Sequence, residues 1–322
     1  MNFQDLAKIE TPDTYLDMAF NAARKRAELA QQQKCTTKLQ KSRHVESVRI
    51  QTIGGNLQKH FDKILTVFPS IDNLPSFYEQ LIRATLEYQQ LKKSLAAVNW
   101  AKNMSQKLTS KYESKINRCQ HFKNIGDYRK EFYGRISSVI KQIRNELAYL
   151  DEARKVMRRY PAIKTDLYTV SICGFPNIGK TTLLSKITDA RPEINNYSFT
   201  TKGINIGYIY LEKKRIVQVI DTPGTLDRFN KMNAIEKQAY IAMKYAAHDL
   251  IYIFDLTESY SLKDQKKLFK RLAEENKNIL IYLSKTDLLT KEAIEEFTKN
   301  LSNVFTDPEA LKNHVIETAK NI

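Results

Sequence analysis

The chain has few cysteines and no long apolar run, and both absences exclude classes of protein. Its 322 residues include three cysteines, Cys35, Cys119 and Cys173, which lie far apart without metal-ligand spacing. An odd, sparse set of cysteines is typical of a reducing compartment, where thiols pack rather than form disulfides. No stretch approaches the ~20 apolar residues that span a bilayer, and the polar start indicates no secretory signal. We therefore expect a cytoplasmic protein without a membrane partner.

Catalytic patterns are also scarce. Outside the loops described below, the chain has no paired carboxylates, nucleophile–base pair or metal-ligand cluster, so a self-standing metabolic enzyme is not expected. It also has no zinc-finger or RRM signature of a self-contained RNA reader. Nothing suggests a coiled-coil dimer, and we expect a monomer.

Positive charge is unevenly distributed along the chain. Residues 1–164 hold 30 Lys and Arg against 16 Asp and Glu, whereas residues 165–322 hold 22 against 20, within a total net charge of +16. The excess could be a solvated helix surface. We favour a polyanionic partner, because clustered cations raise association rates and give salt-dependent affinity for nucleic acid.

Residues 1–160 show apolar stripes at helical spacing and predict an all-α antiparallel bundle. The expected helices run from Pro12 towards Gln33, from Thr36 to Phe68 (with a weak point or kink at Gly54-Gly55), from Ser76 onward, and through Phe132 to Leu147. Thr11 before Pro12 is a suitable start for the first helix. Tyr160-Pro161 ends the bundle, because a proline disfavours helix in the residue before it.

Within this bundle, residues 102–159 are rich in cations and also contain aromatic residues. The cations are Arg118, Lys123, Arg129, Lys130, Arg135, Lys141, Arg144, Arg154, Lys155, Arg158 and Arg159, and the aromatics are Tyr112, Phe122, Tyr128 and Tyr133. Basic side chains contact phosphates, and unpaired RNA bases stack on aromatic rings or Arg planes. Burial in the core is the favoured interpretation for most of these aromatics.

Residues 161–322 predict an α/β domain with a mostly parallel sheet, because short apolar runs alternate with helices. The expected strands are Tyr168–Cys173, Ile204–Leu211, Ile216–Ile220, Leu250–Asp255, Ile279–Leu283 and Val315–Glu317. Ligand-binding loops of such a sheet gather at the carboxyl ends of its strands.

A glycine-rich phosphate loop follows the first of these strands, at residues 174–181 (GFPNIGKT), and leads into a helix. Inward N–H groups and the helix N-terminus favour a polyphosphate, so we expect nucleotide contacts from Asn177, Ile178, Gly179, Lys180, Thr181 and Thr182. Lys180 would reach the β and γ phosphates, and the Thr181 hydroxyl would bind Mg²⁺.

Two further loops predict contacts to the same phosphates and Mg²⁺. Asp221 begins an Asp-Thr-Pro-Gly segment after a predicted strand and would hold Mg²⁺ through water, while the Gly224 N–H would approach the γ-phosphate. Upstream, Thr201 offers a hydroxyl to Mg²⁺ and lies in a candidate nucleotide-sensing switch. Lys180, Thr201 and Gly224 are therefore the expected catalytic residues.

The segment after the strand Ile279–Leu283 resembles the Asn-Lys-x-Asp motif with which GTPases recognise guanine. The resemblance implies that Asp287 accepts the guanine N1–H and amine and that the Lys285 stem lies on the base, with Ser284 replacing the usual Asn. Thr318-Ala319-Lys320 resembles the Ser-Ala-Lys motif that contacts the guanine carbonyl. With the phosphate loop, these motifs resemble a GTP-binding domain of the TRAFAC class, with GTP or GDP and Mg²⁺ as ligands.

Several segments narrow this resemblance to one family. Residues 174–181, 197–201 and 221–224 look like the Obg branch. Residues 147–150 (LAYL), 161–163 (PAI), 171–177 (SICGFPN), 199–202 (FTTK), 232–236 (MNAIE), 72–78 (DNLPSFY) and 118–119 (RC) resemble the Nog-type GTPases, the nucleolar GTP-binding protein 1 family. The resemblance implies domains at 1–160 and 161–322.

This resemblance implies that the protein is an assembly factor for the large ribosomal subunit. Its helical domain would bind ribosomal RNA and ribosomal proteins of the precursor particle. The alternative is an Obg-like signalling or translation-linked GTPase whose basic bundle binds a protein or tRNA. Because the chain stops soon after Lys320, we expect an archaeal member or a truncation, with the last helix of the GTPase domain absent or very short. A eukaryotic member would be nucleolar.

Two residues predict features of hydrolysis. Thr225 stands where Ras-like proteins place the Gln that orients the attacking water, and its shorter side chain predicts slow intrinsic hydrolysis. Asn177 occupies the loop position that helps to bind K⁺ in related GTPases, where a cation would stabilise charge between the β and γ phosphates. Plain support of the loop backbone is an equal alternative for Asn177.

Overall fold

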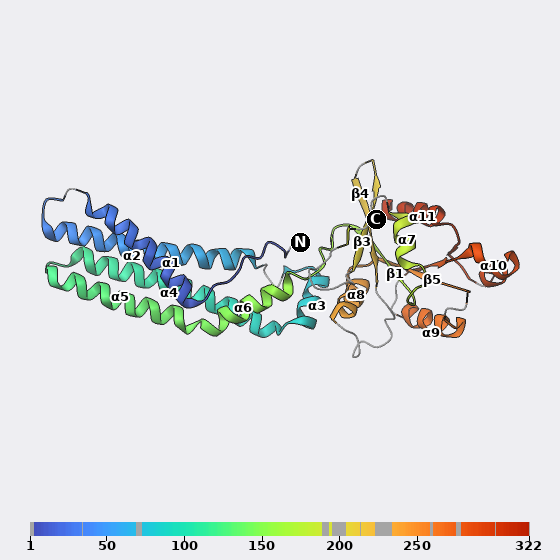
Figure 1. The fold of residues 1–322 in the computed structure, drawn as a ribbon, viewed down its shortest axis with the longest axis horizontal. Coiled ribbons are helices and arrows are strands. Elements are labelled where there is room, and N and C mark those ends of the chain that lie inside the picture. Colours follow the sequence, from blue (N-terminus) through green and yellow to red (C-terminus); the bar gives the residue numbers. More distant parts are fainter. Residues whose placement is uncertain are drawn as a thin grey trace. The chain divides into compact units, whose positions relative to one another are not determined.

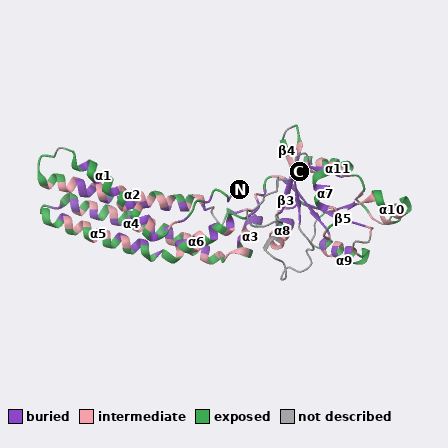
Figure 2. Ribbon diagram, in the orientation of Figure 1, coloured by how far each residue is buried: buried purple, intermediate pink, exposed green. Residues whose placement is uncertain are grey.

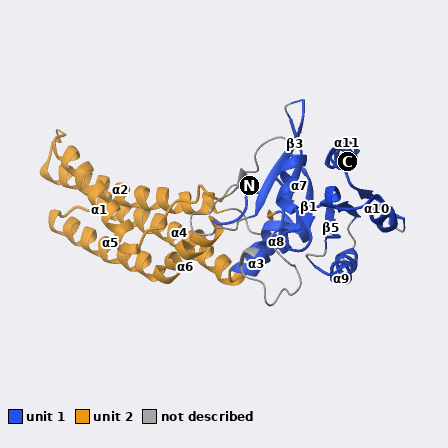
Figure 3. Ribbon diagram, turned by 45° about the vertical axis from the view of Figure 1, so that its right-hand side comes forward, with its two compact units in different colours: residues 1–2, 75–85, 159–322 blue, residues 3–74, 86–158 orange. Residues whose placement is uncertain are grey.

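The computed structural model describes most of the chain. The described residues are 3–33, 35–68, 73–188, 193–194, 204–212, 214–222, 234–257, 260–274, 278–299 and 301–321. They form two compact units, one of residues 3–74 and 86–158 and the other of residues 1–2, 75–85 and 159–322 (Figure 3). The predicted order of a helical bundle followed by an α/β domain is confirmed. No helix in the described ranges is long and apolar enough to cross a membrane.

The first unit is an antiparallel bundle of long helices (Figure 1). Its helices are α1 (Pro12–Gln31), α2 (Lys38–Val67), α4 (Tyr88–Arg118), α5 (Phe122–Gln142) and α6 (Arg144–Met157). The Thr11 hydroxyl caps α1 by accepting from the Thr14 N–H at 3.2 Å, as the sequence predicts. α2 runs through Gly54 and Gly55 without a break.

The second unit is a mixed sheet with helices on both faces. Its strands are β1 (Tyr168–Cys173), β2 (Glu193–Ile194), β3 (Asn205–Leu211), β4 (Lys214–Asp221), β5 (Asp249–Phe254), β6 (Asn278–Leu283) and β7 (Val304–Phe305), in the order β2-β3-β4-β1-β5-β6-β7. β1 pairs in parallel with β4 and β5, and β6 in parallel with β5 and β7. β2 and β3 pair antiparallel at one edge.

Alternation along the central strands buries both faces of the sheet (Figure 2). Ile251 and Ile253 of β5 pack with α7 (Lys180–Ile187) and α11 (Pro308–Lys320), whereas Tyr252 and Phe254 pack with α8 (Ala234–Tyr245) and α9 (Leu262–Ala273). α10 (Lys291–Thr298) adds Phe297 to the second cluster. This double burial explains why β1 and β5 read as continuous apolar runs.

α3 (Ser76–Thr85) belongs to the sheet-containing unit although its sequence lies within the bundle half. It packs against α8 and buries Phe77 and Tyr78. The Tyr78 hydroxyl lies 3.1 and 3.0 Å from the carbonyl oxygens of Pro161 and Ile163. The sequence analysis expected domains at 1–160 and 161–322, whereas the compact units assign α3 to the sheet-containing unit.

Two predictions at the C-terminal end are wrong. Val315–Glu317, predicted as a strand, lies inside α11, where Val315 and Leu311 face the core at helical spacing. α11 is a helix of 13 residues, so the last helix is neither absent nor very short. The edge strand is instead β7, which is two residues long and leaves almost no alternation to read in the sequence.

Candidate functional site

The phosphate loop joins β1 to α7 and has the left-handed backbone that a tight loop requires. Gly174, Asn177 and Gly179 have φ values of +142°, +61° and +96°. The φ of Gly174 is one that residues with a side chain rarely adopt, and a Cβ there would also lie 3.1 Å from the Ile253 carbonyl oxygen, so the loop depends on glycine at this position. In the described part of the chain no side chain caps the start of α7, which leaves its first N–H groups available to an anion.

Lys180 is buried at the first turn of α7. Its Nζ donates to the carbonyl oxygens of Gly174 at 3.2 Å and Phe175 at 2.6 Å. Burial lowers the pKa of this ammonium, and the nearby carboxylate of Asp221 opposes that effect. Among the described residues no carboxylate lies within ion-pair distance of Lys180, so its positive charge is available to a phosphate.

Thr181 and Asp221 meet as a magnesium site requires. The Thr181 hydroxyl donates to Asp221 Oδ2 at 2.8 Å, and Asn205 Nδ2 donates to the same oxygen at 3.2 Å. Asp221 Oδ1 is buried and has no hydrogen-bond partner among the residues that the structure describes, and burial raises the pKa of this carboxyl. A hydroxyl and an unpaired carboxylate oxygen fit Mg²⁺, which would neutralise phosphate charge when bound.

The predicted guanine residues lie at the carboxyl end of β6. Ser284 donates from its N–H and its hydroxyl to the Phe254 carbonyl oxygen, at 2.9 and 3.1 Å. Lys285 follows with a left-handed φ of +53°, and Asp287 is exposed on the short 3₁₀ turn Thr286–Leu288. A Cβ on Gly179 would lie 3.7 Å from Ser284 Cβ, so the phosphate loop and this segment are neighbours.

One cavity of about 500 Å³ brings these two parts of the site together. Its lining residues are Asn177, Gly179, Lys180, Thr181, Thr182, Leu183, Lys186, Tyr282, Ser284, Lys285 and Asp287. Five of the expected residues that the structure describes do not line it: Ile178, Asp221, Thr318, Ala319 and Lys320. Ile178 is buried beneath Gly174, and Asp221 reaches the cavity through its hydrogen bond to Thr181.

The assignment of Thr318, Ala319 and Lys320 to guanine binding is wrong. These residues form the last turn of α11, where the Thr318 hydroxyl donates to the His314 carbonyl and Ala319 packs on the core. Inside a helix, the Ala319 N–H is bonded within the helix and is not free for a base. The segment after β7, Thr306-Asp307, lies at the carboxyl edge of the sheet instead.

Thr201, Gly224 and Thr225 lie outside the described residues, so their expected roles stay predictions. Residues that the sequence analysis did not single out also join the site. Asn205 binds the Asp221 carboxylate, and Asp255, directly after β5, has its carboxylate bonded to Lys285. An aspartate directly after a buried strand was the available signal for Asp255.

The fold and this site define a P-loop GTPase. The chain matches the profile of the NOG1 N-terminal helical domain over residues 3–164 and that of the 50S ribosome-binding GTPase over residues 169–285. The chain belongs to the NOG1 family, and it binds and hydrolyses GTP.

Several relatives and one solved structure resemble the chain. An uncharacterized protein of Methanocaldococcus jannaschii is 36% identical over 91% of this chain and 83% of its own length. Nucleolar GTP-binding protein 1 of Encephalitozoon cuniculi is 34% identical over 77% of this chain and 48% of its own length. The G domain of the T. maritima FeoB iron transporter is 26% identical over 48% of this chain and 99% of its own, with a TM-score of 0.37. The chain spans about half the length of its nucleolar relatives.

Proposed function

We propose that this GTPase is an assembly factor for the large ribosomal subunit, whose helical unit binds ribosomal RNA and ribosomal proteins. The observation that carries the proposal is the joining, in one chain, of a NOG1 helical domain to a domain of the 50S ribosome-binding GTPase type. Relatives with this arrangement have the name Nucleolar GTP-binding protein 1 in fungi, plants and animals. We also propose that the protein is a monomer located in the cytoplasm.

The bundle offers a subset of its cations to such a partner. Six of the eleven singled out in the sequence have acidic partners: Arg129, Arg135, Lys141, Arg144, Arg154 and Lys155. Arg154 is buried as well, so it is removed from the proposed RNA-binding face. The other five are Arg118, Lys123, Lys130, Arg158 and Arg159, which are exposed and have no acidic partner in the described ranges.

Two of the five flank the turn between α4 and α5, which we propose as an RNA contact. Arg118 and Lys123 lie on either side of Phe122, whose side chain is 53% exposed. Lys38 Nζ lies 5.3 Å from the centre of the Phe122 ring. Exposed aromatic rings beside cations suit unpaired bases and their phosphates, whereas Tyr112 is buried and unavailable for stacking.

The GTPase unit would make binding to the precursor particle depend on the bound nucleotide. Thr201, offered to Mg²⁺, precedes Asn205 by four residues, and Asn205 binds the carboxylate of Asp221. A γ-phosphate with Mg²⁺ would therefore order the segments around Thr201 and Gly224 and change how the protein binds the precursor particle. We propose Lys180, Thr201 and Gly224 as the catalytic residues.

We also propose slow intrinsic hydrolysis and stimulation by K⁺. Asn177 is exposed at the rim of the cavity, as a monovalent-cation ligand would be. Release of phosphate from GTP is measured in K⁺ and in Na⁺ at equal ionic strength. Equal rates would contradict the role of K⁺, and turnover near ~1–100 s⁻¹ without a partner would contradict slow hydrolysis.

Sucrose-gradient sedimentation of cell extract tests the assembly role. The protein should migrate with large-subunit precursors, more strongly with a non-hydrolysable GTP analogue and less strongly at high salt. Migration as free protein in both nucleotide states would refute the proposal and favour the Obg-like alternative with a protein or tRNA partner.

A matched pair of double variants tests the proposed RNA contact. Arg118→Ala/Lys123→Ala removes two unpaired cations, whereas Arg135→Ala/Lys141→Ala removes two exposed cations that have acidic partners. The first should lower the slope of log affinity against log salt, for purified precursor particles, by about 1.4–1.8, and the second by much less. Equal effects would mean that binding follows net charge alone.

A further inference from the structure

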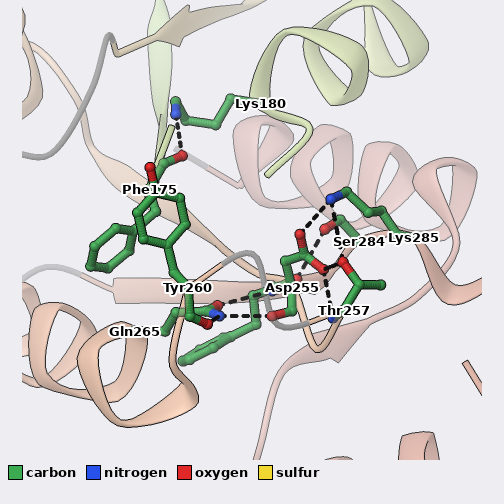
Figure 4. A network of polar contacts seen from close by, with 9 residues as sticks. Phe175, Lys180, Asp255, Thr257, Tyr260, Gln265, Ser284 and Lys285 are labelled. Atoms are coloured by element: carbon green, nitrogen blue, oxygen red, sulfur yellow. Dashed lines mark hydrogen bonds and ion pairs between the residues drawn. The ribbon is translucent and has the colours of Figure 1, made fainter. Parts of the chain in front are cut away.

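Asp255 is a buried carboxylate directly after β5, and it is bonded to Lys285, which lines the nucleotide cavity. Its side chain is 0% exposed, and Oδ2 lies 2.6 Å from Lys285 Nζ (Figure 4). Oδ1 accepts hydrogen bonds from the Thr257 N–H at 2.9 Å and the Thr257 hydroxyl at 2.7 Å. Removing a carboxylate from water is strongly unfavourable unless it is paired and hydrogen-bonded, and both conditions are met here.

The backbone of Asp255 is held as firmly as its side chain. Gln265, fully buried on α9, donates from Nε2 to the Asp255 carbonyl at 2.7 Å and accepts the Asp255 N–H at 3.0 Å. The same Nε2 donates to the Tyr260 carbonyl at 2.9 Å. Gln265 therefore holds the backbone at Asp255 in place, beside the Lys285 side chain that the carboxylate binds.

The network also reaches the phosphate loop (Figure 4). The ring of Tyr260 packs on the ring of Phe175, with 4.6 Å between their centres, and the Phe175 carbonyl accepts from Lys180 Nζ. The residues on the base side are thus connected by packing to those on the phosphate side.

Lys285 needs such an anchor for two reasons. Its left-handed φ of +53° is unfavourable for a residue with a side chain, so surrounding contacts must maintain it. Ser284 occupies the position of the bracing Asn in the motif, and its hydroxyl is directed to the Phe254 carbonyl. The charged contact to Asp255 supplies the orientation from the neighbouring strand instead.

Asp255 is ionised at neutral pH. Burial alone would raise the pKa of this carboxyl, but the hydrogen bonds from Lys285 and Thr257 outweigh burial and lower the pKa. A permanent negative charge therefore faces the Lys285 ammonium.

We propose that Asp255 is a positioning residue for guanine recognition, which orients the Lys285 side chain along the base and thereby the adjacent turn that carries Asp287. The proposal rests on the assignment of Lys285 and Asp287 to the base, which is itself part of the proposed site. Asp255 does not line the nucleotide cavity, so it would act through Lys285.

A double-mutant cycle on the full chain tests this role, with GDP affinity as the readout. Asp255→Asn keeps the shape of the side chain and removes its charge, and it should weaken GDP binding about tenfold. In a Lys285→Ala background the same substitution should change GDP affinity by no more than about twofold, because its target is gone. A purely structural role would lower affinity equally in both backgrounds, and that result would overturn the proposal, as would wild-type affinity in Asp255→Asn.

Asp249→Asn is the matched control, because it removes a buried carboxylate at the opposite end of the same strand. Asp249 binds Asn278 and the Tyr168 hydroxyl, away from the cavity, so its variant should keep wild-type GDP affinity. If Asp255→Asn does not fold, Thr257→Val removes the hydroxyl that donates to Asp255 at 2.7 Å and accepts from Lys285 Nζ at 3.4 Å, and should weaken GDP binding about threefold. An unchanged affinity in a folded Thr257→Val protein would then overturn the proposal.

Asp287→Asn separates failure of this proposal from failure of the guanine assignment. An amide accepts the N1–H of xanthine and donates to its 2-carbonyl, so this variant should prefer XDP to GDP. Without that change in preference, the guanine assignment is wrong. If the preference changes and Asp255→Asn binds GDP normally, only the role of Asp255 is wrong.

Discussion

The two adjacent glycines of α2 should respond in opposite directions to the same substitution. Gly54 is buried against α4, and a Cβ there would lie 2.2 Å from Thr109 Oγ1, 2.8 Å from its Cγ2 and 2.9 Å from its Cβ. Gly55 is exposed, and a Cβ there would have no neighbour within 4 Å. The pair isolates the effect of close helix packing from that of helix propensity.

The magnitudes follow from these distances. Replacing Gly by Ala inside a helix stabilises it by about 1 kcal/mol. At Gly54 this gain is opposed by overpacking, which costs about 1–3 kcal/mol. Thr109 cannot rotate away freely, because its hydroxyl donates to the Ser105 carbonyl at 2.8 Å, and its Cβ is fixed to the backbone. We expect the upper end of the range, so Gly54→Ala should destabilise by about 2 kcal/mol and Gly55→Ala should stabilise by about 1 kcal/mol.

Urea unfolding followed by tryptophan fluorescence measures both values. The single tryptophan, Trp100, lies on α4 in the same unit, so its signal reports on the bundle. Thr109→Ala should recover part of the stability lost in Gly54→Ala, because it removes two of the three clashing atoms. A Gly54→Ala protein as stable as the wild type would refute the claim that α2 and α4 require glycine here.

Two further predictions concern single carboxylates. Asp221→Asn should reduce the contribution of Mg²⁺ to GTP affinity by about 10–100-fold, because the amide lacks the negative charge beside Thr181. Nucleotide titration with Mg²⁺ and with EDTA measures this contribution. An unchanged Mg²⁺ dependence would exclude Asp221 from the metal site. Burial alone would raise the pKa of Asp151, but hydrogen bonds from Arg154, the Ile9 N–H and Lys155 lower it below the ordinary 3.8. The contribution of the Asp151 carboxylate to folding stability is therefore present above that pH and is lost as pH falls through the lower folded-state pKa. Asp151→Asn should lower the free energy of unfolding by about 1–3 kcal/mol at pH 7. In urea titrations below pH 4, the variant should lose less stability with falling pH than the wild type.

Much of the GTPase unit was predictable because its signals are local. The bounds predicted for β1 match those observed, since a strand buried on both faces has a continuous apolar run. The phosphate loop was equally predictable, because glycines mark left-handed backbone positions such as Gly179. The capped start of α1 at Thr11 likewise depends on neighbouring residues only.

Contacts between segments far apart in the chain could not be predicted from the sequence. The mistaken strand at Val315 arose because β-branched residues at the buried face of a helix also form a short apolar run. The eleven cations of the bundle looked equivalent in sequence, yet partners such as Glu46, which binds Arg129 from another helix, decide which of them remain available.

The sequence by itself therefore determined the order of the two domains, the phosphate loop with Lys180 and Thr181, and the place of Asp221 at the carboxyl end of a strand beside that loop. Each of these follows from periodicity or from spacing along a few residues. Only the tertiary structure decided that α3 packs with the GTPase unit and that Asp255 binds Lys285. The physical reason is that such pairs are separated by tens of residues and meet only when packing brings neighbouring strands and helices together.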